Sequence, residues 1–425
     1  MRTNNSNINK TDWKLISIYL LLIVFGWINI YSASKTDLHF KILDFSTEYG
    51  RQILWVVLSF FLIIPVLFLD TRFYKNFSGI FYIISILSLI GLFVFGKRIN
   101  GASSWYAIGS ITTIQPTEFA KIAVSLAIAN LISDKQFDFE KVKNQFIALI
   151  YLLIPALLII LQPDPGSALV YLSFFFVFYR EGLPKYYISI AISLLLIAIF
   201  TIKFGYISIE ISIVFLFILF LRYMYKYKNL FFRKFWIQYI GVFIGLVIFI
   251  FGIHYSYKNL LPKRHTDRID LALNITEDTI NKGYNQEQSK IAIGSGGFFG
   301  KGFLEGTQTK GNFVPEQKTD FIFSTVGEEW GFIGSSIVII LFVILILRII
   351  YIAELQKSRF SRVYGYSIAS IFFIHFTINI GMALGVLPTI GIPLPFFSYG
   401  GSSFLAFTLL LFIFIRLDAN RTNEW

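Results

Sequence analysis

Long apolar runs recur along almost the whole chain, and short polar segments separate them. The runs have roughly 15–23 residues, and about 20 are enough for a helix to cross a hydrocarbon core about 30 Å thick. We predict helical spans near residues 15–31, 52–69, 79–96, 118–132, 145–161, 166–180, 186–202, 207–223, 236–253, 331–351, 364–386 and 399–416. So many long runs exceed what one soluble core can bury. The pattern therefore predicts an all-α, polytopic membrane protein with about ten to twelve transmembrane helices, one long outer loop and a re-entrant loop.

Four segments interrupt this pattern because they combine helix breakers with polar side chains: Lys97–Pro116, Gln162–Gly166, Tyr284–Asp320 and Leu387–Gly401. Counting spans from a cytoplasmic N-terminus places all four on the outer side of the membrane. Polar backbone of this kind must lie in water or line a protein-walled cavity. We therefore predict one site on the outer face, built from all four segments. The three prolines of Leu387–Gly401 exclude continuous helix there and favour a re-entrant loop.

The domain pattern is that of a single transmembrane domain covering residues 1–425. Residues 1–14 are expected to be a cytoplasmic N-terminal segment, followed by a retained signal-anchor span. The only long loop, 254–330, is expected outside the membrane, and its glycine-rich middle cannot be regular helix throughout. Residues 186–223 are predicted to be an extra hydrophobic pair of spans.

The formal net charge of +12 could suit nucleic acid, but its distribution indicates membrane topology instead. Basic side chains gather in the short segments predicted to be cytoplasmic, among them Lys10, Lys14, Lys141, Lys143, Arg222, Lys226, Lys228, Arg233, Lys234, Lys357, Arg359 and Arg362. This bias predicts cytoplasmic N- and C-termini and some attraction to anionic membrane lipids, with no nucleic-acid partner.

The absence of cysteine excludes disulfides, thiolate metal sites and thiol nucleophiles. The four histidines are scattered without ligand spacing, so no cofactor is identifiable. A divalent cation held by acidic residues remains a further possibility, although no ligand set is recognisable.

Asp320 lies where the polar loop re-enters apolar sequence, and two roles are open for it. Partial desolvation would make its carboxylate a good proton acceptor, so it could serve as a general base for a hydroxyl nucleophile. Alternatively, it could cap the helix that begins at Phe321. Glu316, Glu328 and Glu329 are competing carboxylates, although the last two could simply belong to the first helical turn.

Gln115–Lys121 resembles a helix start, with Thr117 as a candidate N-cap. Glu118 and Lys121 are three residues apart and can pair on one helix face. Because ionisable groups at membrane depth are usually functional, Lys121 is a candidate phosphate partner, and a structural ion pair is the alternative.

Two other segments carry supporting candidates. Asp164 could cap the following helix through Ser167 or contribute a carboxylate to the site, and we favour the cap. Ser398 and Tyr399, beside a pair of glycines, are expected to face a polar ligand or backbone and to support the site.

Seven motifs in order resemble those of the SEDS family (shape, elongation, division, sporulation): GASSWYAIG, QPTEFAK, QPDPGSAL, IAIGSGGFFGKG, GTQTKGNFVPEQKTDFIF, GEEWGFIG and GIPLPFFSYGGSS. The resemblance covers most of the chain. It implies a peptidoglycan glycosyltransferase that polymerises lipid II, a disaccharide-pentapeptide on undecaprenyl pyrophosphate, on the outer face of the bacterial cytoplasmic (inner) membrane. The GTQ element is closer to the elongation-type member than to the division-type one. The implied partner is a class B penicillin-binding protein, a transpeptidase.

By that resemblance, Asp320 matches the aspartate thought to deprotonate the acceptor 4-hydroxyl, and Glu118 and Lys121 match residues that line a central cavity. Substrate-binding positions are expected at Lys97, Arg98, Trp105, Asp164, Glu316, Lys318, Thr319, Ser398 and Tyr399. The family commonly has an arginine before the tryptophan, where this chain has Ser104, so Lys97 or Arg98 would have to substitute. Lys318 stands where histidine is frequent, and the family usually has about ten spans. A lipid II flippase and an inactive scaffold are the rival functions.

Overall fold

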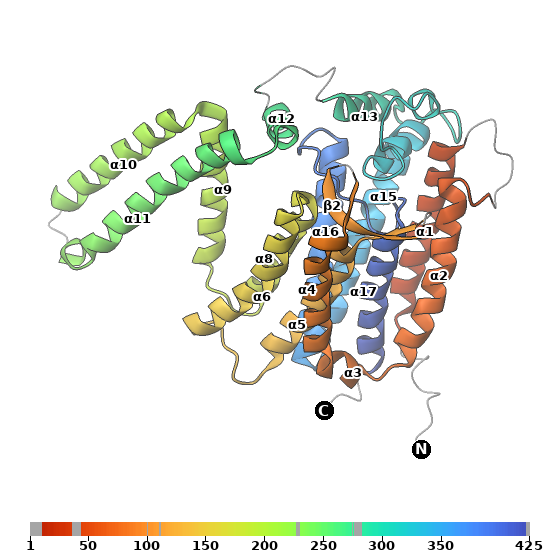
Figure 1. Ribbon diagram of the computed structural model, residues 1–425, viewed down its shortest axis with the longest axis horizontal. Coiled ribbons are helices and arrows are strands. Elements are labelled where there is room, and N and C mark those ends of the chain that lie inside the picture. The colour runs from red at the N-terminus through yellow and green to blue at the C-terminus, as the bar shows by residue number, and fades with distance from the viewer. Residues whose placement is uncertain are drawn as a thin grey trace. The chain divides into compact units, whose positions relative to one another are not determined.

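The computed structural model describes residues 11–35, 44–99, 101–109, 112–226, 230–273, 275 and 283–421 (Figure 1). The chain divides into two compact units, residues 1–184 with 284–425 (unit 1) and residues 185–283 (unit 2). Unit 1 contains α1 (Trp13–Ser34), α2 (Glu48–Phe68), α3 (Thr71–Asn76), α4 (Ser78–Phe95), α5 (Pro116–Ser133), α6 (Val142–Leu161), α7 (Pro165–Leu169), the 3₁₀ turn η3 (Val170–Ser173), α8 (Phe174–Arg180), α13 (Tyr284–Ser295), α14 (Thr307–Lys310), α15 (Ile322–Glu354), α16 (Arg359–Ala383) and α17 (Gly401–Ala419). Unit 2 contains α9 (Tyr186–Phe204), α10 (Tyr206–Lys226), α11 (Leu230–Tyr255), the π-helical turn η4 (Ser256–Leu260) and α12 (Lys263–Ala272).

Ten helices within these described ranges are long and apolar enough to cross a membrane, which confirms the predicted all-α, polytopic class. They are α1, α2, α4, α6, α9, α10, α11 with η4, α15, α16 and α17. The predicted spans at 118–132 and 166–180 are not among the ten. The first is the buried helix α5, which carries Glu118 and Lys121. The second is broken, because the 3₁₀ turn η3 separates α7 from α8.

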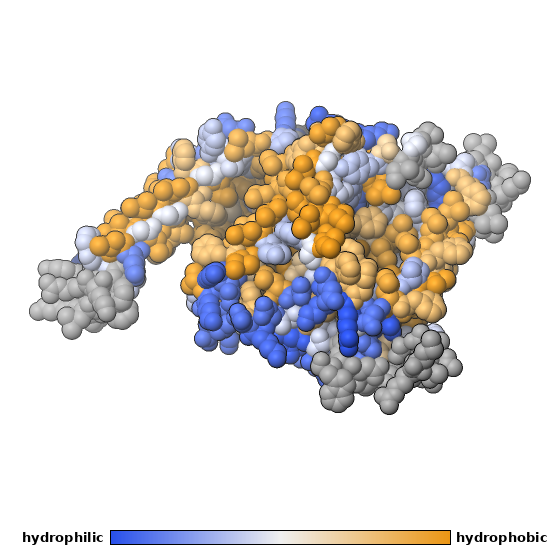
Figure 2. Space-filling model, turned by 60° about the horizontal axis from the view of Figure 1, so that its bottom comes forward, coloured by the Kyte–Doolittle hydropathy of each residue, from blue (hydrophilic) through white to orange (hydrophobic). Residues whose placement is uncertain are grey.

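Ion pairs and hydrogen bonds define one end of unit 1, the termini end, where α1 begins and α17 ends. Arg348 near the end of α15 pairs with Asp12, the N-cap of α1. Gln356 donates to Asp418 of α17 at 2.8 Å, and Glu181 accepts from Arg359 at 3.0 Å. Figure 2 shows hydrophilic side chains gathered on the face that is turned forward from the bottom of Figure 1, where α1 begins and α17 ends.

The middle of unit 1 is formed by α16 and α17, of whose spans 72% and 83% are buried. Helix α16 packs against α15 and α5, and α17 packs against α2. In unit 2, α9, α10 and α11 pack against one another, and only 6% of each span is buried. Apolar side chains left exposed on such helices suit a lipid solvent.

The segment 97–116, predicted as a polar loop, instead contains three short strands. β1 (Lys97–Ile99), β2 (Ala102–Ile108) and β3 (Thr112–Ile114) form an antiparallel sheet in the order β1-β2-β3. Aromatic and β-branched residues such as Trp105, Tyr106 and Thr113 favour strands. The sheet is bound to the rest of unit 1 where Ser103 N–H donates to the Gln162 carbonyl at 3.1 Å.

Helix α15 contains a break at Gly331, whose φ of 62° and ψ of −155° are not helical. The backbone groups freed by the break are paired with the glycine-rich loop before it. Phe332 N–H donates to Gly297 O at 3.0 Å, and Lys301 N–H donates to Glu328 O at 3.0 Å. Backbone pairing of this kind is required where a helix is interrupted at membrane depth. The predicted span 331–351 therefore begins earlier, at Ile322, and ends at Glu354.

Candidate active site

Asp320 lies in a turn at the opposite end of unit 1 from the termini, directly before α15. The N-cap of α15 is Phe321, whose side chain makes no cap hydrogen bond, so Asp320 is not the N-cap residue of this helix. Its side chain is half-buried. Its backbone carbonyl accepts a hydrogen bond of 2.8 Å from the amide of Asn379.

The loop 387–400 between α16 and α17 has no regular helix, as its prolines predict, and it enters the protein interior. Ile392, Leu394 and Phe397 are 0–1% exposed. Asn379 donates to the Ile392 carbonyl at 2.8 Å as well as to Asp320, so a single amide joins the loop to the Asp320 turn. The Tyr399 N–H donates to the Lys318 carbonyl at 2.9 Å, which makes a second link.

Close backbone contacts bring the predicted site segments together at this end. A Cβ atom at Gly391 would lie 3.3 Å from Asp320 Oδ2, and one at Gly166 would lie 2.8 Å from the Ile390 carbonyl. Gln286 of α13 donates to the Leu387 carbonyl at 2.8 Å. The Oγ of Ser402, at the start of α17, accepts from Gln115 N–H at 3.1 Å. These contacts bring parts of all four polar segments together at one end of unit 1, and the placement of a site there on the outer face stays a prediction.

A buried charged network lies beneath the loop. Lys121 Nζ is 2.8 Å from Glu118 Oε2, and the two side chains are 1% and 4% exposed. The same ammonium is 3.0 Å from His375 Nε2, and His375 Nδ1 is 3.0 Å from the Pro393 carbonyl. Because an ammonium can only donate, His375 Nε2 must accept and Nδ1–H must donate to Pro393. The network therefore fixes one tautomer of His375 and braces the loop from below.

This arrangement matches the structural ion pair that was the alternative for Glu118 and Lys121. The Lys121 ammonium also lies 5.0 Å from the centre of the Phe407 ring, so it is enclosed on several sides. A phosphate reaching it would have to displace part of that packing, and the phosphate role stays a prediction. Thr117 is not the N-cap of α5: the cap is Gln115, and Pro116 occupies the first helical position, where its fixed φ is favourable.

Asp164 caps α7, as we favoured. Its Oδ1 accepts from Ser167 N–H at 3.1 Å and its Oδ2 from the Ser167 hydroxyl at 2.8 Å. Gln115 Nε2 also lies 3.3 Å from Oδ2, which links this turn to the segment that follows β3. Both carboxylate oxygens thus have protein partners.

Lys97, Arg98 and Trp105 lie on the sheet, with Lys97 paired in register with Trp105. Both basic side chains are exposed, and Arg98 Nε donates to the Gly101 carbonyl at 3.4 Å. Ser104, where an arginine is common in the family, is fully buried. The contacts given above join the sheet to Gln162 and Ser402 rather than directly to Asp320.

The remaining predicted residues surround Asp320. Lys318 Nζ is 3.4 Å from Glu48 Oε1, and Thr319 Oγ1 is 3.0 Å from Glu316 Oε2. Ser398 is buried and its Oγ accepts from Leu394 N–H at 2.9 Å, so it faces backbone. Burial raises the pKa of the Tyr399 hydroxyl, although the nearby charge of Arg51 lowers it. Tyr399 is therefore a neutral hydroxyl beside a charged cluster.

Backbone strain also occurs in these segments. Glu316 has φ of 58° and Phe396 has φ of 63°, a region that non-glycine residues rarely adopt. Such conformations persist where the surrounding structure fixes them, and they are frequent at functional sites.

Glu328 is not a surface residue of a first helical turn, as one of our alternatives supposed. It is 0% exposed and accepts from Lys301 Nζ at 2.7 Å and from Gln308 and Thr309 N–H at 2.8 Å each. Glu329, 1% exposed, accepts from the Ser32 hydroxyl. Since α15 starts at Ile322, both lie further along the helix, where Glu328 holds the segment around α14 in place.

The residues that the structure describes contain no cluster of three His, Cys, Asp or Glu side chains that could hold a metal ion. Two residues of the site were missed from the sequence, His375 and Asn379. They are four apart on α16 and share a helix face, but their partners lie 254 and 59 residues away in the chain. Nothing local in the sequence indicates those partners.

The fold and the site define a multi-pass membrane protein with a half-buried carboxylate at one end and a charged network packed beneath it. The chain belongs to the family of cell cycle proteins that comprises FtsW, RodA and SpoVE, whose model matches residues 12–216 and 208–423. The two matched stretches overlap at residues 208–216, within the predicted extra pair of spans.

Two relatives have names that state an activity. The peptidoglycan glycosyltransferase MrdB of Escherichia coli (strain K12) is 32% identical over 411 residues, which cover 95% of this chain and 94% of that protein. The peptidoglycan glycosyltransferase RodA of Treponema pallidum (strain Nichols) is 32% identical over 417 residues, 93% of this chain and 94% of that protein.

Solved structures agree with the fold. The rod shape determining protein RodA of Thermus thermophilus matches with a TM-score of 0.62 at 23% identity, covering 97% of this chain and 98% of that one. A chain from a structural study of how a peptidoglycan synthase complex coordinates polymerization and crosslinking matches with a TM-score of 0.70, also at 23% identity, covering 97% and 99%.

Proposed function

We propose that this protein is a peptidoglycan glycosyltransferase of the elongation type, which polymerises lipid II into glycan strands. The observation that carries the proposal is its 32% identity, over nearly its whole length, to proteins of that activity. The site supports it, because a polar turn with a carboxylate at the end of a helical bundle suits a substrate that has a sugar headgroup and a lipid tail.

In the proposed reaction Asp320 is the general base. It takes the proton of the acceptor sugar's 4-hydroxyl as that oxygen forms a bond to the donor's anomeric carbon. The bond from this carbon to the pyrophosphate oxygen breaks, and lipid pyrophosphate leaves with the electron pair. The fixed backbone around Asp320 supports this role, since Asn379 holds its carbonyl and the Gly391 backbone lies close to its carboxylate. A positioned base contributes about 10²–10⁴-fold to such a step.

The proposed location is the bacterial cytoplasmic membrane, with Asp320 on its outer face. Basic side chains support this orientation: Lys75, Lys135, Lys141, Lys143 and Arg180 are exposed at or near the termini end, which the positive-inside rule assigns to the cytoplasm. A class B penicillin-binding protein is the proposed partner, on the strength of the sequence resemblance and of the synthase complex that shares the fold.

The test is polymerisation of fluorescent lipid II by the purified protein together with its partner. Asp320→Asn keeps the side-chain shape and removes the base, so we expect a loss of at least about a hundredfold. Asp138→Asn, an exposed aspartate between α5 and α6, is the matched control and should retain wild-type activity. Undiminished polymerisation by Asp320→Asn would overturn the assigned role. If the protein were a flippase, the wild type and Asp320→Asn would both move lipid II across vesicle membranes. If it were a scaffold, neither the wild type nor Asp320→Asn would form polymer.

A further inference from the structure

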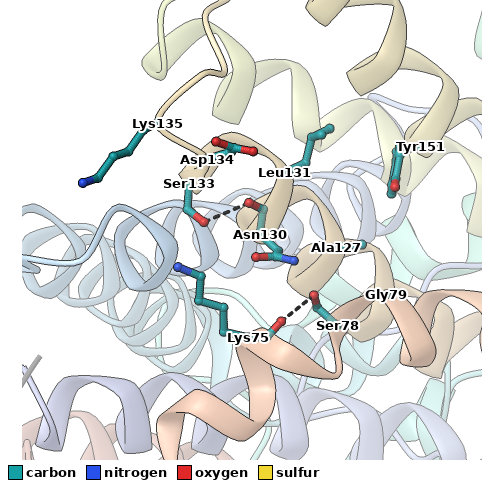
Figure 3. Close-up of a pocket in the computed structure, with 10 residues that line it drawn as sticks. All are labelled: Lys75, Ser78, Gly79, Ala127, Asn130, Leu131, Ser133, Asp134, Lys135 and Tyr151. Atoms are coloured by element: carbon teal, nitrogen blue, oxygen red, sulfur yellow. Dashed lines mark hydrogen bonds between the residues drawn. The ribbon is translucent and has the colours of Figure 1, made fainter.

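A cavity of about 550 Å³ lies at the termini end of unit 1, far from the Asp320 turn along the helices (Figure 3). Its walls are Lys75 of α3, the first residues of α4, the C-terminal part of α5 and Tyr151 of α6. Asn420, directly after α17, donates a hydrogen bond of 2.8 Å to Thr71 of α3. This bond places α3, and with it the cavity, beside the end of α17. The volume is that of a small-molecule site, and the glycosyltransferase reaction proposed above does not use it.

The polar lining is concentrated at one level of the cavity. Lys75, Ser78, Ser133, Asp134 and Lys135 all lie at helix ends. Figure 3 shows the Lys75 ammonium and the Asn130 amide pointing into the space between the α3–α4 corner and α5, with Lys135 at the rim. The Ser78 and Ser133 hydroxyls donate to the carbonyls of Lys75 and Asn130, both at 2.8 Å. Both hydroxyl hydrogens are therefore in use and Ser78 is fully buried, so the donors left for an anionic ligand are the Asn130 amide and the lysine ammonium groups.

The cavity carries a net positive charge. Within the described part of the chain, neither Lys75 nor Lys135 forms an ion pair. Asp134 is the single carboxylate among the lining residues, and its Oδ1 accepts from Gln136 N–H at 3.0 Å. Two ammonium groups against one carboxylate favour an anion at the mouth.

The opposite part of the cavity lies deeper along the membrane-spanning helices and is apolar. Ala127 lines it from α5, about 9 Å from Ser133 at a rise of about 1.5 Å per residue. Tyr151 is nine residues into α6, roughly 13 Å along the helix. The same helices carry exposed apolar side chains, Ile83 on α4 and Phe146 and Ile150 on α6.

We propose that this cavity binds an anionic phospholipid from the leaflet at the termini end, with its phosphodiester between Lys75, Lys135 and Asn130. The lining changes from polar at the mouth to apolar deeper in the cavity. This change favours a lipid over a soluble phosphate, because only a lipid fills both the polar mouth and the apolar part beneath it. Basic pockets between spans on the cytoplasmic side suit such headgroups. The site is independent of the chemistry at Asp320.

Native mass spectrometry of the purified protein, titrated with phosphatidylglycerol, tests the proposal. The double variant Lys75→Ala/Lys135→Ala should weaken binding about 30-fold, since each basic side chain near a headgroup contributes roughly fivefold. Lys141→Ala/Lys143→Ala removes the same charge from exposed positions on the same end of the protein, outside the cavity, and should change binding less than about twofold. Equal weakening by the two doubles would overturn the site, since general surface charge would then explain binding.

Gly79→Leu provides a variant that keeps every charge. No atom lies within 4 Å of a Cβ at Gly79, and Gly79 lines the cavity, so we expect a leucine there to extend into cavity space. We expect it to displace phosphatidylglycerol while the unfolding temperature stays at the wild-type value, and full binding by this variant would contradict the proposal. Phosphatidylcholine, which has no net charge, should bind at least tenfold more weakly. Displacement of the lipid by glycerol phosphate or inorganic phosphate at equal concentration would assign the site to a soluble anion and overturn the lipid.

Discussion

Replacing one member of the buried Glu118–Lys121 pair tests the network beneath the loop. In Lys121→Met the aliphatic stem is kept and the ammonium is removed. Glu118 then loses the lysine 2.8 Å away while it remains 4% exposed. An uncompensated buried charge of this kind costs about 3–5 kcal/mol of unfolding free energy. His375 also loses the donor to its Nε2, which weakens the support of the loop at Pro393.

The double variant Glu118→Gln/Lys121→Met tests whether the two side chains stabilise each other. Replacing both partners with uncharged side chains of similar size leaves no buried charge, so it should be more stable than either single variant. We expect a coupling energy above about 2 kcal/mol from thermal unfolding of the four purified proteins in one detergent. Additive effects of the two substitutions would refute the pairing, since residues that do not interact give no coupling.

The same double variant separates the two roles of Lys121. If polymerisation is lost in a protein whose stability is restored, the ammonium is needed by the substrate and the predicted phosphate role is supported. If polymerisation continues at the wild-type rate, the pair serves the structure alone.

Four further outcomes are expected. Asn379→Asp turns a donor to two carbonyls into an acceptor, so both the unfolding temperature and polymerisation should fall, and unchanged values would refute the link between loop and turn. Gly391→Ala adds about 1–2 kcal/mol of strain at φ of 85° and crowds the candidate base, so it should reduce activity more than Gly182→Ala, which adds similar strain at φ of 110° in open space. Glu328→Ala should lower the unfolding temperature by removing the acceptor of two backbone N–H groups, whereas Glu305→Ala at an exposed position should not. A chelator should leave the unfolding temperature unchanged, and a fall reversed by Mg²⁺ would reveal a metal site.

The sequence predicts the parts of this protein that depend on local pattern. Apolar run length predicts ten of the twelve expected spans, because each must be long enough to cross a bilayer, and it fails for the buried helix α5 and the broken segment 166–180. The helix breakers of Gln162–Gly166 are sufficient to predict the turn at Asp164, because its partner Ser167 is only three residues away. The same local rule misassigned Thr117, because Pro116 moves the start of the helix by two residues.

Contacts between distant segments could not be predicted in this way. The pairing of Lys121 with His375 depends on how α5 and α16 pack, and no single stretch of sequence encodes that. The strands of segment 97–116 were missed because its glycine and polar residues indicate a loop, while the sheet needs the neighbouring Gln162 turn to complete it. Burial of Glu328 was missed for the same reason, since its partners fold back from an earlier loop.

Main-chain hydrogen bonds join the loop at 297–302 to the broken helix α15, alongside the Lys301–Glu328 ion pair and the stacking of Phe298 on Phe332. The main-chain bonds do not depend on which side chains the loop carries, so the exposed ring of Phe299 can be exchanged without undoing them. Gly300 and Gly331 have no such freedom, because a Cβ at either would come within 2.2–2.3 Å of the facing backbone. A saturation-mutagenesis library of this stretch should thus divide sharply, with permissive positions directly beside positions that accept glycine alone.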